Sequence, residues 1–201
     1  MSGITGWTAL SDRVLAGIVH SLNNRIAALE ATLLTFEPGD SPDDLVHALT
    51  KESDRLKECV ATLRTVVGEP NAAAEPCTIA DLFAQAAVLA RYHPELRDLT
   101  FTLDDRGASP VRLRARRAAH ALLVLLASAR RSDDRSAVVV AEGNDEWTNV
   151  SVPAPQDIGS AVTSARELVE PDGGTVALEH ERIVIRLPTL ATVRKWDREK
   201  K

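Results

Sequence analysis

The sequence predicts an α+β protein in which an N-terminal hairpin of two long helices precedes a C-terminal α/β sandwich. Three observations support this fold class. Apolar residues recur at heptad-like helical spacing over residues 11–67. Residues 68–77 contain two prolines and no periodicity, which is typical of a linker. Residues 78–201 alternate helical patterns with short strands in an order typical of a sheet covered on one face by helices. We therefore expect a hairpin domain over residues 1–67, a linker over 68–77 and an α/β domain over 78–201.

The first helix carries a stripe of aliphatic residues. Ser11 is its expected N-cap, Asp12 follows in the first turn, and Pro38 and Gly39 end it. A stripe repeating every seven residues indicates a helix that packs along its whole length against other helices. The stripe consists of Leu15, Leu22 and Leu29, interleaved with Ile18, Ile26 and Leu33.

The second helix begins at Ser41-Pro42-Asp43-Asp44, where a cap, a first-turn proline and two acids suit a helix N-terminus. It ends before Gly68. One hairpin alone cannot bury both stripes well, so two copies are expected to form a four-helix bundle about a two-fold axis, which predicts a homodimer. The alternative is that the stripes pack on the rest of the same chain. The second stripe is Leu45, Leu49, Leu56, Val60, Leu63 and Val67.

The C-terminal segment is expected to alternate helices with strands. A capping pair, Thr78 and Asp81, opens its first helix, and Gly143-Asn144-Asp145 marks a hairpin turn. The charged residues 195–201 are expected to be a solvated tail. The predicted helices are 78–91, 115–131 and 158–170, and the predicted strands are 99–103, 111–113, 137–141, 147–152, 175–178 and 183–187.

Composition excludes several functional classes. The net charge of -5 argues against a nucleic-acid partner, which favours a basic face. Cys59 and Cys77 lack metal-ligand spacing, and two distant cysteines fit a reducing compartment. No signal-peptide pattern opens the sequence, and no apolar run approaches the ~20 residues that span a bilayer. We therefore expect a cytoplasmic protein without a membrane or metal site.

One polar histidine lies on the predicted first helix. His20, Asn23 and Asn24 share a helical face beside the apolar stripe, because they lie three and four residues apart. An exposed imidazole is mostly neutral near pH 7 and can attack phosphorus through a free ring nitrogen. The residues alone leave open whether His20 is a nucleophile or an ordinary surface histidine. Small residues that would let another protein approach closely flank this face: Ala16, Gly17, Ala27 and Ala31.

Three segments resemble conserved boxes of histidine kinases. Residues 19–26, Val-His-Ser-Leu-Asn-Asn-Arg-Ile, resemble the phosphoacceptor box, commonly His-Glu-Leu-Asn-Asn-Pro-Leu in one subfamily. Residues 121–129 resemble the ATPase-domain helix that carries the Asn-Leu-x-x-Asn-Ala box. Residues 159–174 resemble the stretch from Gly-Leu-Gly-Leu to Gly-Gly. The resemblance implies a dimerisation and phosphoacceptor hairpin, with His20 as acceptor, followed by an ATPase-like domain.

The sequence departs from the family where the family binds ATP and magnesium. The two asparagines of the ATPase box fall on Val124 and Ser128, and the second glycine of Gly-Leu-Gly-Leu falls on Ala161. Residues 153–157 lack the adenine-reading Asp-x-Gly-x-Gly, and no room remains for an ATP lid before Gly159. Phosphoryl transfer from ATP depends on positioning and charge neutralisation by such groups. We therefore expect a degenerate ATPase-like domain and no cofactor bound by this chain.

The acceptor segment also departs from the pattern. Ser21 replaces the acidic residue that follows the histidine in kinases, and Arg25 replaces the helix-kinking proline. Asn24 falls where the family has a residue used in dephosphorylation. The loss of the acid suits a loss of kinase activity.

The resemblance implies a phosphorelay phosphotransferase of the kind built like a kinase without an ATP site. Such a protein would pass phosphate through His20 to or from the aspartates of response-regulator receiver domains, whose own pocket would supply magnesium. Three alternatives stay open: a receiver phosphatase that uses Asn24, a non-catalytic pseudokinase that regulates a two-component partner by binding, and an active kinase with divergent nucleotide boxes.

Overall fold

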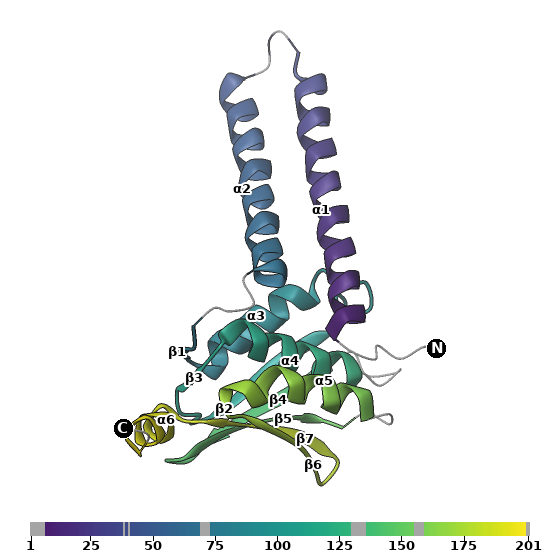
Figure 1. Ribbon diagram of the computed structural model, residues 1–201. Helices are drawn as coiled ribbons and strands as arrows, with labels where there is room; N and C mark the ends of the chain where they lie inside the picture. Colours follow the sequence, from purple (N-terminus) through teal and green to yellow (C-terminus); the bar gives the residue numbers. More distant parts are fainter. Residues whose placement is uncertain are drawn as a thin grey trace.

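Two long helices form a hairpin that stands on an α/β domain in the computed structural model (Figure 1). The structure describes residues 7–37, 39, 41–68, 73–129, 136–154 and 159–199. Helix α1 spans Trp7–Thr35 and helix α2 spans Pro42–Val67, which confirms the predicted hairpin. Among the described residues, no helix is both long and apolar enough to cross a bilayer.

The ends of the hairpin helices differ in part from the prediction. Helix α1 begins at Trp7 instead of after Ser11, whose hydroxyl donates to the carbonyl oxygen of Thr8 inside the helix. Ser41 holds the N-cap position of α2, but its side chain makes no capping hydrogen bond. The expected helix stop at Pro38 lies outside the described residues. Helix α2 ends at Val67, and the amide of Gly68 donates to the carbonyl of Arg64.

The C-terminal domain is a two-layer α/β sandwich, which confirms the predicted architecture (Figure 1). Its larger sheet, among the described residues, has five strands in the order β2-β4-β5-β7-β6; β2 and β4 are parallel and the other pairs are antiparallel. Three helices cover one face, namely α3 (Ile79–Ala90), α4 (Ala115–Ala129) and α5 (Gly159–Val169). The strands are β2 (Thr100–Arg106), β4 (Ser136–Gly143), β5 (Trp147–Pro153), β6 (Thr175–Glu179) and β7 (Arg182–Pro188).

Local chemistry explains two of these elements. Thr78 and Asp81 form the predicted capping box of α3, and hydrogen bonds from Thr78 lower the pKa of Asp81. Helix α4 is buried along nearly its whole length, because it contacts α3, α5, β5 and α1. The apolar run of the α4 sequence is therefore a central core helix, buried among neighbours on several sides.

The predicted linker contains a strand. Residues Glu75–Cys77 form β1, which pairs antiparallel with β3 (Val111–Leu113). Burial raises the pKa of the Cys77 thiol to about 11, with a further contribution from the charge of Asp81. Residues 69–72 of the expected linker lie outside the described part of the chain.

The expected solvated tail is instead largely helical. Helix α6 spans Leu190–Glu199. Leu190, Val193 and Trp196 share one of its faces, and all three are partly buried. The Trp196 ring meets Trp147 edge-on with 6.2 Å between ring centroids. The apolar side chains spaced among the charges therefore hold this segment against the domain.

Candidate functional site

His20 lies on α1 with its side chain exposed to solvent. Asn24, one turn further along, places its amide nitrogen Nδ2 3.2 Å from His20 Nε2. An amide nitrogen donates, so this contact is a hydrogen bond in the tautomer that carries its proton on Nδ1 and accepts at Nε2. In that tautomer the ring nitrogen with the free electron pair is the one beside Asn24.

Ser21, the residue after His20, contacts helix α2. The Ser21 hydroxyl lies 3.5 Å from the Cys59 sulfur on α2, and that sulfur lies 3.6 Å from the Tyr92 hydroxyl. Burial, together with the hydrogen bond to Cys59, raises the pKa of Tyr92. These three side chains tie α1, α2 and the turn after α3 together. Ser21 is thus a packing residue in this arrangement.

Arg25, which stands where the family has a proline, belongs to an ion-pair group between the two hairpin helices. Its guanidinium lies 3.4 Å from a carboxylate oxygen of Glu52, which also pairs with Arg55. The Glu52 side chain is only 12% exposed. The Arg25–Glu52 pair therefore joins α1 to α2 just beyond the His20 turn, and Arg25 continues the helix where a proline would kink it.

Gly17 requires a correction. We predicted that its small size would leave room for another protein, but the same chain fills that room. A Cβ atom added to Gly17 would lie 1.8 Å from the backbone carbonyl oxygen of Tyr92. One turn earlier, Arg13 forms an ion pair with Glu95. The C-terminal domain is therefore docked on α1 directly beside the His20 turn.

The rest of the predicted docking face is open. The side chains of Ala16, Asn23, Ala27 and Ala31 are all exposed, as are those of His20 and Asn24. The face around His20 is therefore bounded on one side by the docked domain and is accessible along the helix beyond it.

A second contact fixes the base of the hairpin. The Trp7 ring stacks on His120 of α4 with 3.6 Å between ring centroids and 14° between planes. His120 Nε2 donates to the carbonyl oxygen of Thr65 on α2 at 3.2 Å. Burial, with a smaller contribution from the charge of Arg116, lowers the pKa of His120 to about 3. A neutral, buried imidazole thus joins both hairpin helices to α4.

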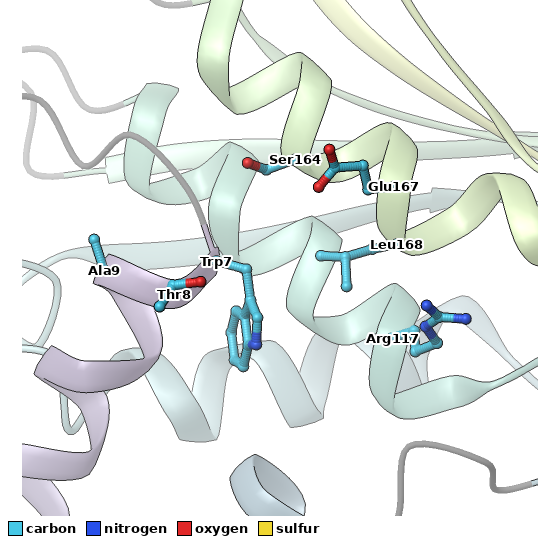
Figure 2. A pocket seen from close by; sticks show the side chains of 7 residues that line it. All are labelled: Trp7, Thr8, Ala9, Arg117, Ser164, Glu167 and Leu168. Carbon is cyan, nitrogen blue, oxygen red and sulfur yellow. The ribbon is translucent and has the colours of Figure 1, made fainter.

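A pocket of about 520 Å³ opens beside this contact, between the first turn of α1 and helices α4 and α5 (Figure 2). Thr8 and Ala9 line it from α1, Arg117 lines it from α4, and Ser164 and Glu167 line it from α5. The pocket is thus a gap left where the hairpin meets the sandwich.

Two positions of α4 correspond to the residues that bind ATP and magnesium in histidine kinases. The side chains present at these positions do not fit ATP and magnesium. Val124 is buried in the core, and the Ser128 hydroxyl donates to the carbonyl of Leu125 at 2.8 Å. Ala161, which replaces a glycine of the family, is also buried. The expectation about residues 153–157 lies partly outside the described chain. No group of three or more His, Cys, Asp or Glu residues in the described chain could hold a metal ion.

No protein-family model matches this sequence, and no curated protein matches it. Solved structures do. The chain is similar to the histidine kinase AdeS of Acinetobacter baumannii, at 17% identity and a TM-score of 0.47, covering 85% of this chain and 98% of that one. It is also similar to a bacterial phosphotransferase, at 17% identity and a TM-score of 0.41, over 88% of this chain and 94% of that one.

A third similar structure is the ATP-binding domain of PrrB from Mycobacterium tuberculosis, at 20% identity and a TM-score of 0.47. It covers 58% of this chain and 97% of that one. Each of these three structures is at most 20% identical to this chain.

Sequence reasoning missed the residues that dock the two domains. Tyr92, Glu95, Trp7 and His120 all act through contacts with distant parts of the chain. One signal was present, because a glycine in the middle of a long helix costs about 1 kcal/mol relative to alanine and needs a reason. At Gly17 the reason is the close contact with the Tyr92 carbonyl of the same chain.

Proposed function

We propose that this chain is a histidine phosphotransfer protein in which His20 accepts a phosphoryl group from an aspartate of a receiver domain and can return it. The observation that carries the proposal is the exposed His20 imidazole on an open helical face, with Nε2 in hydrogen-bond contact with Asn24. The docked domain leaves this face accessible, so a partner can reach the ring without unfolding the hairpin.

The proposed reaction is an in-line transfer between two surfaces. A bond forms from His20 Nε2 to phosphorus as the bond from phosphorus to the aspartate oxygen breaks. The carboxylate leaves with the electron pair, and Nδ1 keeps its proton. Asn24 must release Nε2 before the attack, since its amide faces that nitrogen. The receiver's acidic pocket would supply magnesium, and docking alone would supply the positioning.

ATP is not part of the proposed reaction. We expect no saturable heat when ATP and magnesium are titrated into the protein at millimolar concentration, because Val124 is a buried apolar residue and the Ser128 hydroxyl donates its proton to the Leu125 carbonyl. Isothermal calorimetry measures this, with an active histidine kinase as the positive control. Binding at low micromolar concentration would instead support an ATP-dependent kinase.

We also propose that the protein is a homodimer through the hairpin. Apolar side chains remain exposed on both helices of the single chain and recur every seven residues on α1. On α1 this stripe lies about 100° around the helix from His20, so a second copy could cover it without covering the imidazole. The exposed stripe comprises Val19, Ile26 and Leu33 on α1 and Val46, Val60 and Val67 on α2.

The dimer can be tested on α2. The wild-type chain should scatter light with about twice its mass of 21.7 kDa. Val60→Lys should shift it to the monomer mass, because an unpaired charge inside an apolar interface costs several kcal/mol. Ala61→Lys is the matched control, since Ala61 is exposed and lies about 100° away from the stripe. A wild-type chain that is monomeric, or equal effects of both lysines, would contradict the proposed interface.

The direct test of the function is transfer of labelled phosphate from a phosphorylated receiver domain to this chain without ATP. Stable label on the protein supports the proposal. Faster loss of receiver phosphate without labelled protein would point to a phosphatase that uses Asn24. Tight binding without either effect would point to a pseudokinase that acts by occupancy.

A further inference from the structure

We infer that the turn after α3, residues 91–98, forms part of the surface that receives the receiver domain, so that the docking site is shared between the two domains of this chain. This inference rests on the proposed function of His20. It concerns a different part of the molecule, which we call the α3–β2 turn.

The α3–β2 turn lies along α1 just before His20. The Tyr92 carbonyl lies against Gly17, and Glu95 pairs with Arg13. At 1.5 Å per residue, these two contacts are about 4.5 Å and 10 Å along the helix axis from His20. Arg13 and His20 are seven residues apart, so they lie on the same helical face. Figure 1 shows α3 crossing beneath the hairpin toward α1, where this turn follows it.

The size of a receiver domain brings the turn within reach of a partner that is docked on His20. A stable protein interface covers roughly 800 Å² on each partner, equivalent to a disc about 16 Å in radius. A disc of this size centred on His20 extends beyond Arg13. The phosphoaspartate must reach His20 Nε2, so the receiver cannot be shifted far along α1 to avoid the turn.

The turn is built as a firm surface. His93 and Leu96 are buried, and the carbonyl of His93 accepts hydrogen bonds from the amides of Leu96 and Arg97, each at 3.0 Å. Between the two contacts with α1, the chain exposes Pro94. A surface that is already ordered loses little conformational entropy when a partner binds. Pro94 is therefore an exposed position of an ordered turn at which a substitution can test contact with the receiver.

The receiver carries negative charge where it meets His20, because the reacting group is an acyl phosphate beside a carboxylate. A carboxylate introduced at Pro94 would face this charge and weaken docking. The matched control is Pro110→Glu. Pro110 is also an exposed proline of the C-terminal domain, and its carbonyl accepts from Leu190 of α6, far from the hairpin (Figure 1).

The experiment measures binding separately from transfer. Each receiver domain of the source organism, with magnesium and beryllofluoride to mimic its phosphorylated state, is titrated by calorimetry into the His20→Gln protein. We expect Pro94→Glu in that background to raise Kd at least tenfold and Pro110→Glu to leave it within twofold. Both variants should keep the circular dichroism spectrum and melting temperature of the parent, and Arg97→Glu serves as a second test if Pro94→Glu does not fold.

The outcomes separate this inference from the proposed function. If Pro94→Glu and Arg97→Glu both bind like the parent while wild type is labelled by the receiver, the shared surface is wrong and His20 remains the carrier. If Pro94→Glu weakens binding but wild type takes no label, the shared surface stands and phosphotransfer is wrong. If no receiver binds the parent at all, both are overturned.

Discussion

Replacing His20 with glutamine is expected to abolish the labelling of this chain by a phosphorylated receiver domain. Glutamine keeps the size and polarity of the side chain but has no nucleophilic ring nitrogen. His20 lies exposed on α1 and its side chain contacts Asn24, so the substitution removes no core contact. We expect at least a thousandfold slower labelling, with dimerisation and receiver affinity nearly unchanged.

Two variants control for indirect effects. His47→Gln removes another exposed histidine, on α2, and should leave labelling at the wild-type rate. Asn24→Ala should also keep labelling, because the amide must leave Nε2 before attack, but it is expected to slow any dephosphorylation that Asn24 assists. Labelling of His20→Gln at a rate near that of wild type would show that the phosphoryl carrier lies elsewhere.

Gly17→Ala is expected to destabilise the protein, although the same change in an open helix would stabilise it. Alanine in place of glycine favours a helix interior by about 1 kcal/mol. At Gly17, however, the added carbon would lie 1.8 Å from the Tyr92 carbonyl oxygen, and a backbone atom cannot swing aside as a side chain can. Overpacking of this kind costs about 1–3 kcal/mol, so the net change should be a lower melting temperature.

Hydrogen exchange locates the effect. In Gly17→Ala, amides of the α3–β2 turn and of the first turns of α1 should exchange faster, because the turn must move away from the helix. Ala16→Leu is the control, since Ala16 is the exposed neighbour of Gly17 on α1. A raised melting temperature in Gly17→Ala would mean that α1 and the turn are not in close contact.

Much of the fold could be predicted because its signals are local. The heptad stripes predicted the α1–α2 hairpin, and the Thr78 and Asp81 pair predicted the start of α3. The turn around Asn144 was also predicted from local sequence. In the structure, the Asn144 side-chain oxygen accepts from the amides of Glu146 and Trp147 and closes the β4–β5 hairpin.

The elements that were missed depend on distant partners. Strand β1 has a Glu-Pro-Cys sequence with little strand propensity and forms because β3 pairs with it. The charges of residues 195–201 predict a solvated tail, whereas the position of helix α6 depends on the contact of Trp196 with Trp147. Trp7 extends α1 four residues before Ser11 because His120 stacks on it.

The sequence predicted part of the candidate site. The spacing of His20 and Asn24 predicted a shared face, and the structure joins their side chains. The sequence could not show that Ser21 turns toward Cys59 or that Arg25 pairs with Glu52, because both partners lie on the other helix. The prediction for Gly17 was wrong for the same reason. A glycine inside a helix indicates that another group approaches closely, but the sequence does not show which group it is.

The central claim, that His20 carries phosphate between receiver domains, is tested most directly by mapping the label. Wild-type protein is mixed with each phosphorylated receiver of the source organism in magnesium and without ATP, and the modified residue is identified by mass spectrometry. The account predicts one phosphorylated residue, His20, with a phosphoryl group that is labile in acid, stable in alkali and returned to an unphosphorylated receiver. Tight binding to a receiver with no phosphate on His20 would contradict it.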